Sequence, residues 1–374
     1  MKVAILTHPL GTNYGGILQN YALQQVLKNL GHQPVTLNYQ FEIPRKTKIL
    51  SWGGRLLQRL RGKKIPLRVW TTPKEHSIIT QYTGRFIRKH INVTDSFFLD
   101  KIQEIDIGRP DAIVVGSDQV WRGSHPDVSH FFLRDFDGQN IKKVAYAASF
   151  GVNFWEYSKS DTELCKRLVQ QFKAVSVREN GGVNLCKKYF EITPQLVLDP
   201  TLLLKCEDYD TLVNIKQIGD KRTHYIMTYV LDKTPAKMRM IEKVSQSLGL
   251  LQKTVMVDNY FNEVGKKGLE SCIYPPVEDW IRGFRDADFV VTDSFHGTVF
   301  SILYHKPFVS FVNKYRGADR FISLLSILHL EERLVDREEE VLSLIRKPID
   351  YVIVDSLLQE KREESLEFLK NSLQ

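Results

Sequence analysis

The sequence lacks a long hydrophobic run: no apolar stretch approaches the ~20 residues that a helix needs to cross a bilayer. It also shows no secretory leader, because the apolar run at residues 1–6 is short and no cleavage site follows it, so it is better interpreted as a first strand. These two absences argue against an integral membrane protein and predict a cytoplasmic one.

Cysteine is scarce as well. Cys165, Cys186, Cys206 and Cys272 lie far apart with no C-x-x-C pair, which argues against a disulfide framework and a cysteine zinc site. The H-E-x-x-H and G-x-S-x-G signatures are also missing, so zinc-dependent or triad-type hydrolysis is not expected. No metal and no cofactor is predicted.

Acidic residues are absent from one long segment. The formal charge is +8, but residues 43–74 contain ten Lys or Arg and no Asp or Glu, so the rest of the chain carries 8 − 10 = −2. Leucines alternate with cations between Arg55 and Lys64, a mixture that suits an anionic membrane surface. A solvated insertion is the alternative interpretation. Since no nucleic-acid motif accompanies the charge, a nucleic-acid partner is not expected.

Short β-branched runs alternate with helical patterns along the whole chain, which predicts parallel sheets with crossover helices. At 374 residues the chain suits two domains of this α/β class. We expect a Rossmann-like domain over residues 1–205, with the basic insertion at 43–74, and a second over 206–348. A last helix at 349–374 is expected to pack back across a hinge near Pro200.

Ligands of open α/β sheets gather where strands end and helices begin. Residues 7–16 (THPLGTNYGG) follow the first predicted strand, and their glycines would let the backbone approach a ligand closely. The stretch matches neither the G-x-G-x-x-G nor the phosphate-loop pattern. A glycine-rich turn that only starts a helix is the alternative interpretation.

A second strand-to-helix switch lies at residues 289–304, where Asp293 or Ser294 would cap a helix and His296 would occupy its first turn. The positive helix end disfavours the protonated imidazole, whereas a bound anion would favour it. His296 is therefore predicted to exchange a proton near neutral pH; a purely structural histidine is the alternative interpretation.

Three further polar clusters follow predicted strands. Residues 116–122 (GSDQVWR) combine a carboxylate, an amide, an indole and a guanidinium, as carbohydrate sites do; a capped turn with Trp121 in the core is the alternative. Arg178 beside Glu179 could hold a phosphate or carboxylate, or form an internal ion pair. Lys314, Arg316 and Arg320 form either an anion clamp or a solvated loop.

Six motifs in this order resemble the polysaccharide pyruvyl transferase family. They cover most of the chain between about residue 3 and residue 330: NYGGILQNYAL at 13–23, GSDQVW at 116–121, YAASFG at 146–151, SVRE at 176–179, LDPT at 198–201 and DSFHG at 293–297.

The resemblance implies an architecture similar to that of two-domain glycosyltransferases of the GT-B type. It also implies transfer of the enolpyruvyl unit of phosphoenolpyruvate onto two sugar hydroxyls as a cyclic ketal. Arg178 and His296 correspond to the family's donor-binding arginine and histidine. Many relatives have Arg-Leu-His where this chain has Ser294-Phe295-His296, so one donor arginine is missing, and Lys314 or Arg316 is expected to replace it.

The resulting site prediction has three parts. The catalytic residues are His296 and Asp118. The donor phosphoenolpyruvate is bound by Arg178, Ser294, Gly297, Thr298, Lys314 and Arg316. A lipid-linked or nucleotide-linked glycan acceptor is bound by Asn13, Tyr14, Gly15, Gln19, Gln119 and Trp121.

Two other functions remain open. A glycosyltransferase that uses a nucleotide sugar would share the architecture, since fold alone does not decide function. A non-catalytic glycan-binding protein is the other, and the missing arginine favours it. For an enzyme acting on a lipid-linked acceptor, the expected location is the inner face of the cell membrane.

Overall fold

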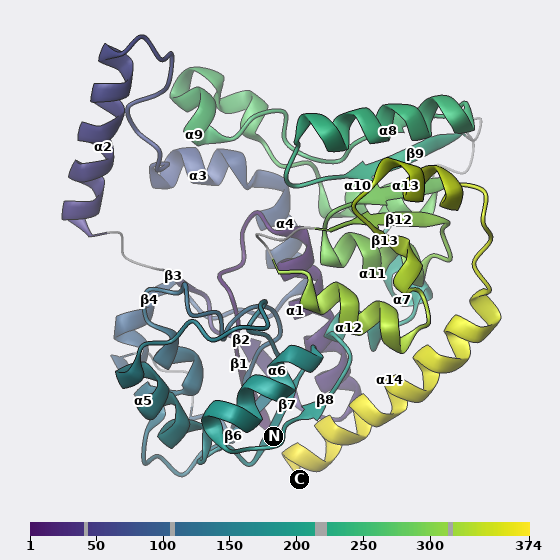
Figure 1. The fold of residues 1–374 in the computed structure, drawn as a ribbon. Helices are drawn as coiled ribbons and strands as arrows, with labels where there is room; N and C mark the ends of the chain where they lie inside the picture. The colour runs from purple at the N-terminus through teal and green to yellow at the C-terminus, as the bar shows by residue number, and fades with distance from the viewer. Residues whose placement is uncertain (41–43, 105–108, 214–222, 313–316) are drawn as a thin grey trace.

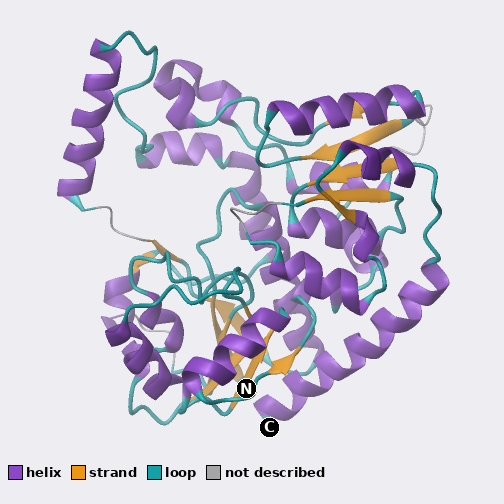
Figure 2. Cartoon of the chain, viewed as in Figure 1, coloured by secondary structure: helices purple, strands orange, loops and turns teal. Residues whose placement is uncertain are grey.

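The chain forms two parallel β-sheets, each covered by helices (Figures 1 and 2). The computed structural model describes residues 1–40, 44–104, 109–213, 223–312 and 317–374. The two-domain Rossmann-like fold class predicted from the alternating pattern is confirmed.

The first sheet has six strands in the order β2-β1-β5-β6-β7-β8, all paired in parallel. Its strands are β1 (Lys2–Leu6), β2 (Gln33–Thr36), β5 (Ala112–Val115), β6 (Lys142–Ala148), β7 (Ala174–Val177) and β8 (Gln195–Leu196). Helices on its faces include α1 (Tyr14–Asn29), α5 (Lys159–Val169) and α6 (Asn180–Leu185). All residues of β5 are buried, as expected for a strand covered on both faces.

The second sheet has five strands in the order β10-β9-β11-β12-β13, again all parallel. The strands are β9 (Tyr225–Tyr229), β10 (Leu251–Lys253), β11 (Phe289–Thr292), β12 (Phe308–Phe311) and β13 (Leu334–Val335). The helices are α8 (Pro235–Leu248), α9 (Phe261–Val264), α10 (Val277–Arg285), α11 (Phe295–Leu303), α12 (Asp319–Ile327) and α13 (Glu338–Leu344).

In each sheet the second strand of the chain pairs on one side of the first strand, and the later strands are added on its other side. The reversal falls between β1 and β5 in the first sheet and between β9 and β11 in the second. At such a switch point the loops after neighbouring strands turn to opposite faces and leave a crevice at the carboxyl ends. The loops after β1, β5, β9 and β11 are therefore where a ligand site is expected.

The apolar pattern of the sequence predicts a strand over residues 254–257, but the structure places the strand a few residues earlier. β10 occupies Leu251–Lys253, and all three of its residues are exposed, so it is an edge strand without an apolar pattern. Val255 and Val257 are buried just beyond it, which moved the predicted strand along the chain. Periodicity follows burial, and here burial and strand pairing fall on different residues.

The basic segment is helical in its first part, whereas residues 61–72 form a connection without regular structure. α2 (Arg45–Leu60) is followed by α3 (Pro73–Ile79) and α4 (Gln81–His90), and a two-stranded sheet of β3 (Tyr39–Gln40) and β4 (Phe97–Phe98) brackets them. A capping box at Thr72 and Glu75 starts α3. The Ile79 carbonyl accepts a hydrogen bond from the Tyr274 backbone amide, so the segment packs on the second half of the chain.

The last helix, α14 (Tyr351–Leu373), contacts both halves (Figure 1). The Tyr351 hydroxyl donates to the Lys306 carbonyl, while Lys142 of β6 donates to the Leu373 carbonyl. A short 3-10 turn at Pro200–Leu202 joins the halves and contacts α1 and α11. One apolar cluster runs through both halves, with Tyr14 of α1 stacked on Trp280 of α10 at 5.8 Å between ring centroids.

Among the described residues, no helix combines the length and the apolar character that crossing a membrane requires.

Candidate functional site

A cavity of about 420 Å³ lies where the two switch points face each other. The first half lines it with His8, Thr12, Asn13, Asp118 and Gln119; the second half contributes Tyr229, Leu231, Met256, Tyr260, Tyr274, Asp293, Ser294, Phe295, His296 and Arg320. The cavity thus gathers the residues that follow β1, β5, β9 and β11. Of the predicted site residues, Asn13, Asp118, Gln119, Ser294 and His296 line it.

His296 reaches the cavity across the backbone of α1. A Cβ atom added to Gly15 would lie 2.1 Å from Nδ1 of the His296 ring, closer than any side chain tolerates. Gly15 therefore leaves the space that the imidazole occupies. The acceptor contact predicted for Gly15 stays a prediction, whereas its steric role is plain in the structure.

Two polar residues shape the start of α11. The Ser294 hydroxyl accepts a hydrogen bond from the Gly297 amide at 3.4 Å, as an N-cap residue does. The preceding Asp293 accepts from the backbone amides of Leu231 and Asp232 and from the Lys237 ammonium, at 2.6 to 3.1 Å. Asp293 thereby fixes the loop after β9 to the loop after β11.

A buried ion-pair cluster closes the floor of the cavity. The Arg178 guanidinium donates to Asp118 at 2.8 Å and to Asp199 at 2.5 Å. Asp118 has a left-handed backbone with φ at 72°, and this conformation directs its carboxylate to the Gln119 amide as well. A non-glycine residue in this region is strained, and such strain persists where surrounding contacts hold it, as they do here.

The electrostatics of the floor follow from these pairs. Burial alone would raise the pKa of Asp118, but the Arg178 guanidinium holds it well below the usual range. The same competition applies to Asp199, where His296 and Arg178 hold the pKa well below normal against burial. Burial would lower the pKa of Arg178, but the two carboxylates raise it. Both carboxylates are therefore ionised and compensated at neutral pH.

His296 stands between this floor and the open cavity. Its Nε2 atom lies 3.7 Å from Asp199, and its side chain is almost fully buried. The carboxylate is close enough to orient the ring and to balance the charge of the imidazolium form. The predicted role of His296 in proton transfer stays a prediction, with a position that suits it.

Arg320 supplies the cation of the cavity wall. It is the one Arg or Lys among the described residues that line the cavity. It lies 3.8 Å from Asp118, and its guanidinium covers the Phe295 ring at 5.5 Å. Burial lowers the pKa of Arg320 to about 10, so it is protonated at neutral pH. The sequence grouped Arg320 with Lys314 and Arg316 but did not assign it to the site.

His8 also lines the cavity, and the sequence reasoning missed it. Its ring lies 4.8 Å from that of His125, and burial lowers its pKa, so it is neutral at pH 7. His125 in turn contacts the Gln119 carbonyl at 2.9 Å. The signal was present, because His8 lies two residues beyond β1, at the strand end where the glycines were considered.

Several predicted contact residues lie outside the cavity lining. The structure corrects the role predicted for Trp121. Its indole donates to the Phe131 carbonyl and stacks on Phe132 at 4.7 Å between ring centroids, so Trp121 belongs to the core and offers no stacking platform for a sugar. The Tyr14 hydroxyl donates to the Pro275 carbonyl, and the Gln19 amide donates to Thr7. These buried side chains hold α1 in place, and neither is among the residues that line the cavity.

The predicted donor residues also divide. Arg178 is not among the residues that line the cavity, and both of its terminal nitrogens donate to carboxylates, so its predicted donor contact stays a prediction. Thr298 is engaged with Ser310, and Gly297 packs against Thr292, so neither side of α11 there is open. Lys314 and Arg316 lie outside the described residues.

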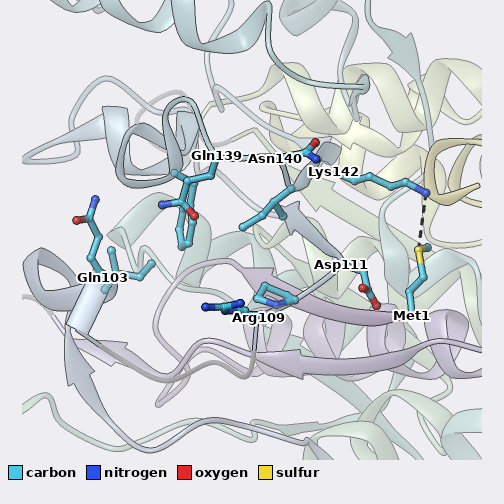
Figure 3. Close-up of a pocket in the computed structure, with 11 residues that line it drawn as sticks. Met1, Gln103, Arg109, Asp111, Gln139, Asn140 and Lys142 are labelled. Carbon is cyan, nitrogen blue, oxygen red and sulfur yellow. Dashed lines mark hydrogen bonds between the residues drawn. The ribbon is translucent and has the colours of Figure 1, made fainter.

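A larger hollow of about 1150 Å³ lies at the opposite end of the first sheet (Figure 3). Arg109, Asp111 and Lys142 line it, next to the amino ends of β5 and β6. Its lysine already donates to carbonyls of α14. Because ligands of parallel sheets bind at the carboxyl ends, volume alone does not make this hollow the candidate site.

The fold resembles that of GT-B glycosyltransferases. A UGT89C1 structure from Arabidopsis thaliana, described as complexed with UDP-L-rhamnose, superposes with a TM-score of 0.53 at 10% identity, covering 100% of this chain and 98% of that one. A glycosyltransferase of kitacinnamycin gives 0.50 at 11% identity, covering 100% and 99%. At such identities the likeness shows the fold alone. No curated protein matches the sequence.

The family is shown by the sequence. The model of the polysaccharide pyruvyl transferase family matches residues 13–315, which is most of the chain. The protein belongs to this family, as its six motifs indicated, and the family indicates a transferase.

Proposed function

We propose that the protein transfers the enolpyruvyl unit of phosphoenolpyruvate to a sugar of a cell-surface polysaccharide precursor, forming a pyruvate ketal and releasing phosphate. The observation that carries the proposal is the cavity itself. In a member of this family, it brings Arg320, His296 and His8 together at the facing strand ends.

The donor is a small, highly charged anion, so its site must supply positive charge without surplus carboxylate. Arg320 gives a permanent cation in the wall, and the start of α11 adds a helix N-terminus. Arg178 carries one positive charge and pairs with both Asp118 and Asp199, so it offsets part of the repulsion that these carboxylates would exert on the donor. Arg320 thus provides the positive charge that the arginine of Arg-Leu-His provides in many relatives, whether or not Lys314 and Arg316 contribute.

The reaction needs a proton at carbon and a base for a hydroxyl. We propose that His296 protonates the donor methylene, which gives an oxocarbenium-like centre at the adjacent carbon. The first sugar hydroxyl adds there and gives its proton to neutral His8. The phosphate then leaves with the electrons of its C–O bond, taking up that proton, and the second hydroxyl closes the ring and returns a proton to His296.

Asp118 was predicted as a second catalytic group. In the proposed site its carboxylate holds Arg178 and Arg320 in place, 2.8 Å and 3.8 Å away. Asn13 and Gln119 line the side of the cavity that the first half provides, so we propose that they bind the acceptor. A lipid-linked acceptor would place the enzyme at the inner face of the cell membrane.

The test is transfer from phosphoenolpyruvate. The purified chain is incubated with phosphoenolpyruvate and a panel of lipid-linked and nucleotide-linked glycans, and phosphate release and pyruvate addition are followed by mass spectrometry. Wild type is expected to be active. The variants His296→Gln and Arg320→Gln are expected to have a transfer rate that is lower by about 100-fold or more. The matched controls His76→Gln and Arg239→Gln change exposed residues outside the cavity and are expected to retain activity.

A nucleotide-sugar-dependent glycosyltransferase is the second candidate, since the fold is that of GT-B enzymes. Sugar transfer from a uridine diphosphate sugar by wild type, with no consumption of phosphoenolpyruvate, would select it. Binding of glycans with neither reaction would select a non-catalytic binding protein.

A further inference from the structure

α2 is the least covered helix of the described chain. None of its residues is buried, and it carries five of the exposed large apolar side chains: Ile49, Leu50, Trp52, Leu57 and Leu60. Leu50 and Leu60 are each 76% exposed. Leucines this open are ordinary when scattered, but a group of them on one helix marks an interaction surface.

Most apolar side chains of α2 share one side of the helix, and three of its five cations lie beside them. Ile49, Leu56 and Leu60 follow one another at intervals of seven and four residues, so they form one stripe. Lys48, Arg55 and Arg59 repeat the same intervals one position earlier and flank the stripe. No acidic residue occurs between Arg45 and Lys74, and the first one after this segment is Glu75.

The helix is held in a fixed place on the second half of the chain. The Arg55 guanidinium donates to the Pro66 carbonyl at 2.8 Å and to the Asn262 carbonyl of α9 at 3.0 Å. Arg68 adds a contact over the Phe261 ring at 5.3 Å. Figure 1 shows α2 at the outer edge of the molecule, beyond α3 and α9.

We propose that α2 is an interfacial helix that binds an anionic lipid bilayer, with its leucines inserted among the acyl chains and its cations at the headgroups. Charge complementarity selects this occupant. A second copy of the chain would bring two acid-free basic helices together, whose charges repel, and a nucleic acid would engage the cations but leave the leucines in water.

This attachment goes beyond the proposed function, because it does not depend on which group the cavity transfers. It does have a geometric consequence for the site. Asn262, which Arg55 contacts, lies two residues from Tyr260, and Tyr260 lines the cavity. A bilayer under α2 would therefore lie on the side of the molecule that carries this rim of the cavity.

The test is co-sedimentation of the full chain with vesicles of phosphatidylcholine alone and with phosphatidylglycerol added. We expect binding only to the anionic vesicles, weakened by salt, because screening shortens the reach of surface charge to about 8 Å at physiological ionic strength. The variant Leu50→Ser/Leu60→Ser is expected to lower the partition coefficient by about tenfold or more. Lys46→Gln/Lys48→Gln/Arg59→Gln should lower it by about fivefold per cation at low salt.

Matched variants control for total charge and apolarity. Val352→Ser/Ile353→Ser removes two other exposed apolar residues, from α14, and Lys173→Gln/Lys187→Gln/Lys188→Gln removes three other exposed cations. Both are expected to bind like wild type. Equal sedimentation of the α2 variants and these controls would overturn the proposal. So would loss of a dimer in the leucine variant on analytical ultracentrifugation, which would assign the face to a second copy.

Discussion

α1 and α2 are both 16 residues long and both belong to the N-terminal half, yet thirteen residues of α1 are buried and none of α2 is. The cause is position. α1 lies between the first sheet and the helices of the second half, and so it carries apolar residues all round and polar ones that are paired internally. α2 has only one contact side, and so its sequence is strongly amphipathic.

Two helices of the same length can therefore have different roles. α1 positions residues of the site, whereas α2 offers an exposed surface. In α1 most side chains are buried against neighbours, and Gly15 leaves the space that the His296 ring occupies. In α2 most side chains could change without altering the fold. Matched substitutions in the two helices should therefore have very different effects on reaction rate and on stability.

The largest difference is expected for glycine to alanine. Gly15→Ala places a Cβ where the His296 ring lies, at 2.1 Å, so the ring must move. Displacement of a proton-transfer group should lower the rate of the proposed phosphate release by about 100-fold to 10,000-fold. Gly53→Ala of α2 meets nothing within 4 Å and should leave the rate unchanged and stabilise the helix by up to about 1 kcal/mol. Equal rates in the two variants would show that Gly15 does not position His296.

The next largest difference is expected for arginine to alanine, between the floor of the cavity and the exposed surface of α2. Arg178→Ala removes the guanidinium that two buried carboxylates share and is expected to lower the free energy of unfolding by about 3 to 5 kcal/mol. Arg59→Ala, on the exposed side of α2, should change it by less than about 0.5 kcal/mol. Urea unfolding followed by circular dichroism measures both, and Arg178→Lys is expected to recover only part of the loss, since a single ammonium lacks the forked geometry. Unchanged stability in Arg178→Ala would contradict the charge-compensation account.

Glutamine to alanine gives a smaller contrast. The Gln24 amide of α1 donates to Thr36 at 2.8 Å and to the Asn92 carbonyl at 2.7 Å, and its carbonyl accepts from the Asn92 amide. Loss of these buried partners should cost about 1 to 3 kcal/mol of stability. Gln58→Ala, exposed on α2, should stay within about 0.5 kcal/mol in the same unfolding assay. A Gln24 variant as stable as the Gln58 variant would show that the polar face of α1 is dispensable.

The smallest effect concerns pH. Burial lowers the pKa of His8 below 6.5, so the unfolded chain takes up this proton more readily than the folded one. The stability due to neutral His8 is present above about pH 6.5 and falls at lower pH, by at most about 1.4 kcal/mol per pH unit. Thermal unfolding between pH 7.5 and pH 5 should show a shallower decline in His8→Gln than in wild type, and no change in slope in His76→Gln. Parallel slopes in all three proteins would contradict a buried, neutral His8.

The alternation of strands and helices predicted the fold, because parallel sheets buried on both faces require continuous apolar strands such as β5. The rule that ligands bind at strand ends found Asn13, Asp118 and His296. It did not find the direction of side chains. Trp121 turns into the core, where its indole donates to the Phe131 carbonyl, and composition does not reveal the left-handed backbone of Asp118 in the same loop.

Arg320 shows a second limit. It reaches the cavity because α12 is docked on the first half, where Asp319 accepts from the Gly181 amide and Ser323 from the Asn180 amide. These contacts join residues about 140 positions apart, and no local pattern encodes them. The partners of Arg178 are likewise set by the sheet order, since Asp118 follows β5 and Asp199 follows β8.

The apolar cluster shared by the two halves has a mechanical consequence. Swinging the halves apart would expose Tyr14 and Trp280, both fully buried, at a cost of about 25 cal/mol for each Å² of apolar surface returned to water. α14 acts as a strut across the same joint, since it is bonded to β6 at one end and to the loop before β12 at the other. Small molecules are therefore expected to reach the cavity, which Tyr260 and Tyr274 help to line, without the two halves swinging apart.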